Sequence, residues 1–126
     1  MEQTLQEVKR TERGWGAHFA EVHHCEFRRN TLLEHGDTRL VVSTIGAYTP
    51  RRDGKYSLVN AYGFYETLVF KADGAPYWDP IPSQQVGFDS KWCIEKMRST
   101  IDIEANDMHE AVVYEMTKKL QEGKKV

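Results

Sequence analysis

Residues 25–45 read Cys-Glu-Phe-Arg-Arg-Asn-Thr-Leu-Leu-Glu-His-Gly-Asp-Thr-Arg-Leu-Val-Val-Ser-Thr-Ile, and this stretch decides the fold. Its second part, 38–45, is rich in β-branched residues, which favour strands. Its first part, 25–33, also reads as a strand, and so does 16–22 before it. Gly36 between them can take the positive φ that a tight turn needs. We therefore expect 25–33 and 38–45 to form a β-hairpin.

The chain on both sides of this hairpin is expected to add strands and an arm. Segment 64–70 alternates along its length, which predicts a strand with two different faces. Segments 77–80 and 84–88 are expected to be short edge strands, because prolines in 80–82 exclude a central strand. Residues 1–13 are charged and show little periodicity, so we expect a frayed or swapped N-terminal arm.

The C-terminal third changes to a helical period. A short helix is expected over 90–98, after a possible serine or aspartate cap. In the last helix the apolar residues recur at steps of three and four, namely Ile101, Ala105, Met108, Val112, Met116 and Leu120. Lysines followed by Gly123 predict its end. The expected fold is α+β: an antiparallel β-sheet followed by two C-terminal α-helices packed on one face.

Composition limits the classes of function. The chain has 126 residues, so we expect a single domain, 1–126. A net charge of −2 argues against binding polymeric nucleic acid, which needs a basic field. No apolar run approaches the roughly 20 residues that span a bilayer, and the first residues lack a signal-peptide core. A cytoplasmic protein without a membrane partner is expected.

The segment 23–33 combines imidazoles, an aromatic ring and paired guanidinium groups. Consecutive residues of a strand point to opposite faces, so Arg28 and Arg29 should serve different surroundings. His24 shares a face with Arg28 by its even spacing. Guanidinium groups grip phosphate and imidazoles stack on bases, so this segment suits a nucleotide. The alternative is a solvated amphipathic strand with Phe27 turned inward.

The residue types give little reason to expect metal or covalent catalysis. Adjacent histidines on a strand diverge, so His23 and His24 do not make a zinc pair with Cys25. Cys93 lacks a base and an orienting group that the sequence can place beside it. We therefore expect no metal, no cofactor and no catalytic residue.

A second polar stretch, 104–110, opens the last helix. Asn106 and His109 lie three residues apart on a face that neighbours the apolar stripe, so they can act together. Asparagine is a poor helix former, which hints at a task for its side chain. Phe88 and Trp92 lie just upstream and could form a stacking wall for a base. The alternative is an ordinary polar first turn beside core aromatics.

Four groups of residues together resemble one protein family. They are 13–34 (Arg-Gly-Trp-Gly-Ala-His-Phe … Phe-Arg-Arg-Asn-Thr-Leu-Leu-Glu), 65–67 (Tyr-Glu-Thr), 88–93 (Phe-Asp-Ser-x-Trp-Cys) and 104–110 (Glu-Ala-Asn-Asp-Met-His-Glu). Their combination resembles the phage Thoeris anti-defence protein one family, whose members act as sponges for nucleotide signals. The resemblance extends over about 13–122.

The resemblance implies a function as well as the fold expected above. Members of the family bind cyclic ADP-ribose isomers without cleaving them, and some bind cyclic trinucleotides at separate sites. They assemble as homo-oligomers, either dimers or hexamers. By this resemblance Phe88, Trp92 and Asn106 would hold the ADP-ribose isomer, and His24 and Arg28 would hold the cyclic oligonucleotide. The family pattern favours a C-terminal arginine as phosphate clamp, where this chain has only lysines.

Two other classes of function stay open from the sequence. One is a protein-binding inhibitor or accessory protein that uses the arginine-rich strand. The other is a small hydrolase of a nucleotide messenger with His24 or His109 as general base. A sponge needs affinity and not rate, so it requires no matched acid–base pair.

Overall fold

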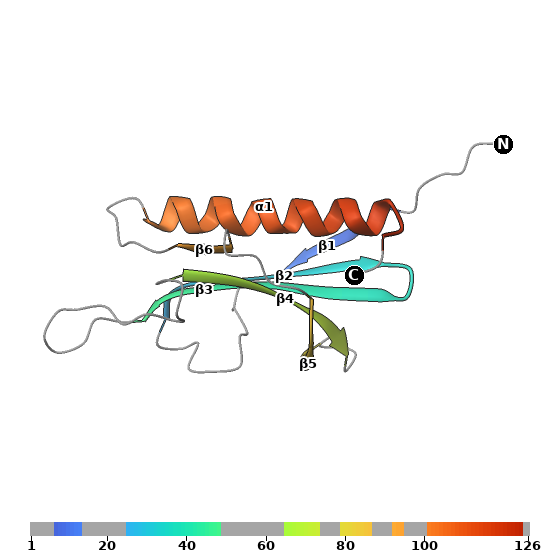
Figure 1. Ribbon diagram of the computed structural model, residues 1–126, viewed down its shortest axis with the longest axis horizontal. Coiled ribbons are helices and arrows are strands. Elements are labelled where there is room, and N and C mark those ends of the chain that lie inside the picture. The colour runs from blue at the N-terminus through green and yellow to red at the C-terminus, as the bar shows by residue number, and fades with distance from the viewer. Residues whose placement is uncertain are drawn as a thin grey trace, which may run out of the picture.

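The computed structural model describes residues 7–13, 25–48, 65–73, 79–86, 92–94 and 101–124. Within these residues an antiparallel sheet carries one long helix along one of its faces (Figure 1). The strands are β1 (Lys9–Glu12), β2 (Cys25–His35), β3 (Thr38–Tyr48), β4 (Tyr65–Asp73), β5 (Asp79–Gln85) and β6 (Cys93–Ile94), and the helix is α1 (Ile101–Gln121). The α+β class expected from the sequence is therefore confirmed.

The hairpin of β2 and β3 is the centre of the sheet. The two strands pair from His35↔Thr38 to Cys25↔Tyr48, and Gly36 in the turn has a φ of 57°. β4 follows beside β3, and the spatial order is β1-β2-β3-β4-β5. The predicted hairpin and the predicted turn glycine are both confirmed.

The two edge strands differ in extent from the expected ones: β1 replaces part of the expected arm, and a single β5 replaces two short segments. β1 pairs with β2 from Lys9↔Glu34 to Glu12↔Thr31, so these residues are an edge strand and not a frayed arm. β5 runs through both prolines on the other side, which an edge strand tolerates. The predicted strand 16–22 lies outside the described residues.

The second predicted helix, 90–98, is wrong for its described part. Cys93 and Ile94 form β6, which pairs with Glu66 and Tyr65 of β4. β5 pairs with the other end of β4, so the edge of β4 at Tyr65 and Glu66 can pair with β6. Trp92, Cys93 and Ile94 belong to types that suit a strand. Tertiary pairing has thus outweighed the weak helical signal.

The core lies between α1 and the sheet. Its buried apolar members are Leu33, Leu40, Val42, Val69, Trp92, Val112, Val113, Met116 and Leu120. A smaller cluster around Tyr65 and Ala105 continues it, and Phe27 packs edge-on against Tyr65 with ring centroids 6.3 Å apart. The predicted apolar stripe of α1 is confirmed at Ala105, Val112, Met116 and Leu120.

α1 ends at a glycine as the sequence predicts. Gly123 has a φ of 69°, its N–H donates to the carbonyl of Leu120 at 3.2 Å, and the N–H of Lys124 reaches the carbonyl of Lys119 at 2.9 Å. This pair of bonds is the Schellman arrangement, which satisfies carbonyls that the helix leaves open. The lysines of the last turn are thereby held in place beside the groove described below.

Candidate functional site

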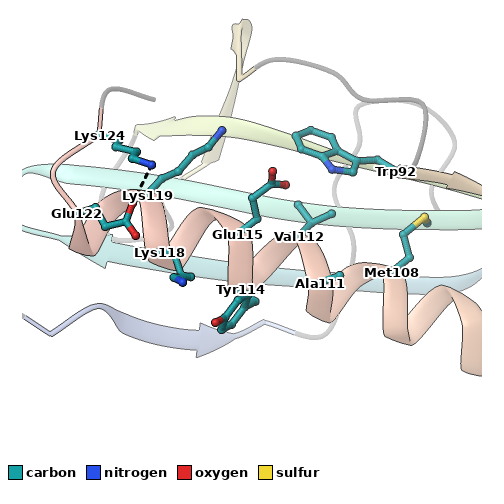
Figure 2. A pocket seen from close by; sticks show the side chains of 10 residues that line it. All are labelled: Trp92, Met108, Ala111, Val112, Tyr114, Glu115, Lys118, Lys119, Glu122 and Lys124. Atoms are coloured by element: carbon teal, nitrogen blue, oxygen red, sulfur yellow. Dashed lines mark ion pairs between the residues drawn. The ribbon is translucent and has the colours of Figure 1, made fainter.

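Helix α1 has two flanks with opposite character. We call the side next to β1 the β1 flank; Asn106 and Glu110 lie on it. We call the other side the Trp92 flank; Met108 and Glu115 lie there with Trp92. Figure 2 shows Trp92 above β4 on one side of α1 and Tyr114 on the side of β1. The two flanks are candidates for a site, and their contacts distinguish them.

His109 is the centre of a polar network under α1. The side chain is fully buried, at 0% exposure. Its Nε2 lies 2.8 Å from Oγ1 of Thr31 on β2, and its Nδ1 lies 2.7 Å from Oγ1 of Thr44 on β3. Thr44 continues the network to Thr67 of β4 at 2.6 Å. One imidazole therefore ties the helix to three neighbouring strands.

The end of this network fixes the direction of its hydrogen bonds. Thr31 donates its hydroxyl proton to the carboxylate of Glu12 at 2.9 Å, so its oxygen must accept from His109. His109 thus carries its proton on Nε2, and its Nδ1 accepts from Thr44. Burial, followed by the positive charge of Arg29, lowers the pKa of His109 to about 4. The imidazole is therefore neutral at pH 7.

The outer part of the β1 flank is a saturated cluster of charges. Arg10 grips both carboxylate oxygens of Glu110 at 2.8 Å. Arg29 bonds Glu12 at 3.0 Å through Nε and Asn106 at 2.7 Å through Nη1. The hydrogen bond from Arg10 is the main reason why the pKa of Glu110 falls to about 2. Every cation of this cluster already has an anion.

The Trp92 flank opens instead into a groove that extends across α1 to Tyr114 and Lys118. A hollow of about 610 Å³ runs along the second half of α1 (Figure 2). Its described lining is Trp92, Met108, Ala111, Val112, Tyr114, Glu115, Lys118, Lys119, Glu122 and Lys124. Its floor is apolar and its rim is charged. That combination, and a volume between about 300 and 1,000 Å³, are typical of small-molecule sites.

The indole nitrogen of Trp92 is the polar atom that most clearly indicates a ligand site in the groove. The side chain is 5% exposed, and its Nε1 is buried with no hydrogen-bond partner among the described residues. In Figure 2 this nitrogen lies on the edge of the ring that faces α1. A buried N–H without an acceptor costs about 1–3 kcal/mol, so native structures rarely keep one without a reason. A ligand acceptor in the groove would remove this cost.

The described rim of the groove carries more lysines than carboxylates. Lys124 pairs with Glu122 at 3.0 Å, and Lys118 lies over the ring of Tyr114 at 5.5 Å from its centroid. Lys119 makes no ion pair with a described residue, and Figure 2 shows it on the same side of α1 as Trp92. Lys118 and Lys119 outnumber Glu115, the only carboxylate of the described lining without an ion pair to a described residue. The groove therefore favours an anionic ligand.

The structure separates the predicted ligand residues. Trp92 lines the groove, but Asn106 lies on the opposite flank and accepts from Arg29. Within one subunit they do not line the same pocket, although the sequence placed them together. Arg28 lies on the sheet face turned away from α1, opposite to Arg29, as the alternation predicts. Phe88 and His24 lie outside the described residues.

Several residues of the site were missed by reasoning from sequence. Glu115 was not singled out, and Lys119 was noted only at the helix end, where the family pattern favours an arginine. His109 was placed on a polar face beside the core stripe, and this is wrong because it lies in the core. The signal was present: His109 follows Ala105 by four residues and precedes Val112 by three, which is the spacing of the stripe itself.

In the part of the chain that the structure describes, no cluster of three or more histidine, cysteine, aspartate or glutamate side chains could hold a metal ion. In the same residues, no helix has the length and apolar character needed to cross a membrane. In the comparisons with known proteins, no family model, curated protein or solved structure matches the chain.

Proposed function

We propose that the protein is a sponge that binds and sequesters a cyclic ADP-ribose isomer without cleaving it, and that the groove on the Trp92 flank holds the ligand. The observation that carries the proposal is the buried indole N–H of Trp92, which has no hydrogen-bond partner in the described part of the chain, in a groove rimmed by Lys118 and Lys119. The ligand class offers a pyrophosphate for the lysines and base or ribose acceptors for the indole. In a Thoeris-type antiviral response, sequestration would withhold the signal from its effector.

The chemistry of the described residues supports binding over cleavage. A general base must reach the proton that it removes. His109 is fully buried and both of its nitrogens are hydrogen-bonded, so it is a poor base for a ligand in the groove. The hydrolase alternative therefore depends on His24. Among the described residues, the groove itself offers Glu115 and Glu122 as carboxylates, and Glu122 is paired with Lys124.

The contacts of Arg29 weaken the protein-binding alternative. That alternative needs the arginines of β2 for a partner. Arg29 is already bonded to Glu12, Asn106 and Glu110, and its side chain is only 18% exposed. A partner would have to break this cluster before it gained a contact from Arg29.

The proposal is tested by titration followed by recovery of the ligand. Calorimetry with cyclic ADP-ribose isomers should show tight binding, and the ligand should be recovered intact after the protein is denatured. Lys119→Ala should weaken binding about ten-fold, as expected for a lost charge-assisted contact. Lys9→Ala, which removes an exposed cation across α1 from the groove, is the matched control. Cleaved ligand would favour the hydrolase, and no binding to any isomer would favour the protein-binding alternative.

A second ligand, a cyclic trinucleotide at His24 and Arg28, stays a prediction of the resemblance. Because Arg28 faces away from α1, a site there would be separate from the groove. Arg28→Lys keeps the charge and loses the planar fork, so it should weaken the trinucleotide alone. Parallel titrations of both ligands would show whether the two sites are independent.

A further inference from the structure

Glu115 places a carboxylate among the lysines of the groove on the Trp92 flank. It lies on α1 four residues before Lys119, and both residues are half-buried. A glutamate followed by a lysine at this spacing is well placed for an ion pair on a helix. Here neither side chain forms an ion pair with a described residue. The acceptors of Glu115 are therefore not used by the lysine one turn away.

The polar groups of the groove follow one another in a definite order. Figure 2 shows the carboxylate of Glu115 between the amino group of Lys119 and the indole of Trp92, on one side of α1. At the rise per residue of an α-helix, Glu115 and Lys119 lie about 6 Å apart along the axis. The groove thus presents an N–H donor, then an acceptor, then a cation. A nucleotide presents base acceptors, then ribose hydroxyls, then phosphate, which is the complementary order.

We infer that Glu115 accepts hydrogen bonds from the hydroxyl groups of the adenosine ribose and makes the groove selective for nucleotides whose ribose carries no phosphate. This inference rests on the proposed function and names the chemical class of its ligand. An ionised carboxylate only accepts hydrogen bonds, so it suits hydroxyl donors. Dinucleotide-binding folds use an aspartate or glutamate in the same way, and they use an arginine where the ribose carries a 2′-phosphate.

The ribose fits Glu115 better than the base or the phosphate does. If Glu115 accepted from the amino group of the base, the ribose would face Lys119, and the cation would lose its phosphate. With the ribose at Glu115, the indole N–H of Trp92 meets a base acceptor and Lys119 meets a phosphate. A further phosphate on this ribose would meet Glu115 as a like charge, and such a repulsive contact is a common source of specificity. The enzyme that makes the ligand must therefore start from a dinucleotide without a 2′-phosphate.

Calorimetry with two probes, cyclic ADP-ribose and cyclic ADP-ribose 2′-phosphate, tests the inference. The native protein should bind the first probe at least about ten-fold more tightly than the second. Glu115→Gln keeps the size of the side chain and removes its charge. It should weaken binding of the first probe about five-fold and tighten binding of the second about three-fold. Loss of the fold would weaken both, so opposite signs identify the contact with the ribose.

Glu122→Gln is the matched control, because Glu122 lines the same groove but is paired with Lys124 at 3.0 Å. Its loss releases a lysine, so both probes should bind more tightly. If Glu115→Gln shifts both affinities in one direction, or leaves their ratio unchanged, the inference is wrong and the groove site stands. If the native protein binds neither probe, the inference is also wrong. Binding of another cyclic ADP-ribose isomer in the titration above would then still support the proposed function.

Discussion

The two flanks of α1 carry similar types of polar side chain but differ in how many of these side chains bond to each other. On the β1 flank, Arg10 and Arg29 meet Glu12 and Glu110, and the charges are matched atom by atom. In the groove of the Trp92 flank, the lysines exceed the carboxylates, and the indole N–H of Trp92 has no acceptor among the described residues. The first flank stabilises the fold through contacts within the chain. The second leaves Lys119 and the indole N–H of Trp92 without such contacts among the described residues.

This difference shows that residue type alone does not mark a binding site. Arginine, asparagine and histidine drew attention to the β1 flank in the sequence, yet there they bond to each other. What separates a site from a scaffold is the number of donors left without acceptors inside the molecule. The following changes should therefore affect stability on one flank and binding on the other.

The largest effect is expected at the centre of the network. His109→Ala should lower the free energy of unfolding by about 3–4 kcal/mol, because it opens a cavity and leaves the hydroxyls of Thr31 and Thr44 without the imidazole. Urea unfolding measures this change. Tyr114→Ala on the exposed side of the same helix should cost less than about 0.5 kcal/mol. Similar losses in both variants would mean that the network adds nothing to helix docking.

Acid should weaken the β1 flank in two stages. The pKa of His109 is about 4 in the folded protein and about 6.5 in the unfolded chain, so the unfolded chain binds more protons between these values. Stability should therefore fall as the pH drops from 6.5 to 4, by about 3 kcal/mol in all. Glu110, whose folded pKa is about 2, should add a further loss from about pH 4.5 downward.

The control for this pH dependence is a variant without the imidazole. Unfolding of His109→Asn, measured at several pH values, should lack the loss between pH 6.5 and 4 and should keep the loss at lower pH. An unchanged upper stage in His109→Asn would assign that stage to another group.

A change at Trp92 should instead lower the affinity for the ligand and leave the stability of the fold nearly unchanged. Trp92→Phe keeps a ring in the core and removes the buried N–H. Its affinity for the nucleotide should fall by about 1–1.5 kcal/mol, while its stability without ligand should change by less than about 1 kcal/mol. Calorimetry and thermal unfolding of the same samples measure both quantities. Lower stability with unchanged affinity would mean that Trp92 serves the core alone.

The smallest effect is expected at Asn106. It is exposed, and its contact is the hydrogen bond with Arg29. Asn106→Ala should therefore lower stability by less than about 1 kcal/mol and leave affinity for the groove within about two-fold. A ten-fold loss of affinity in a well-folded Asn106→Ala protein would show that the ligand reaches both flanks, as the sequence predicted.

The parts of the fold that the sequence predicted are those with a local period. The hairpin of β2 and β3, β4 and the stripe of α1 follow from alternation or from steps of three and four. β1 was missed because Lys9–Glu12 has no apolar residue, and its place is set by distant partners such as Thr31 and Glu110. β6 was missed because two residues carry no period, and the free edge of β4 decided its pairing.

The candidate site was predicted only in part for the same reason. Trp92 was singled out as an aromatic wall, and it lines the groove. That its N–H has no acceptor among the described residues could not be foreseen, because a missing acceptor is a property of the folded surroundings. Asn106 was predicted to have a task for its side chain; in the structure its Oδ1 accepts from Arg29, which lies far away in the sequence.

The hydrogen-bond chain from Glu12 through His109 to Thr67 has a consequence for the order of folding. It joins β1, β2, β3 and β4 to a helix that is synthesised last, and Arg10 and Glu110 are 100 residues apart. The bonds made by His109 and Glu110 cannot form until α1 has left the ribosome, and contacts of such separation slow folding. The amides of β1 and α1 should accordingly gain protection from hydrogen exchange together, as one cooperative unit.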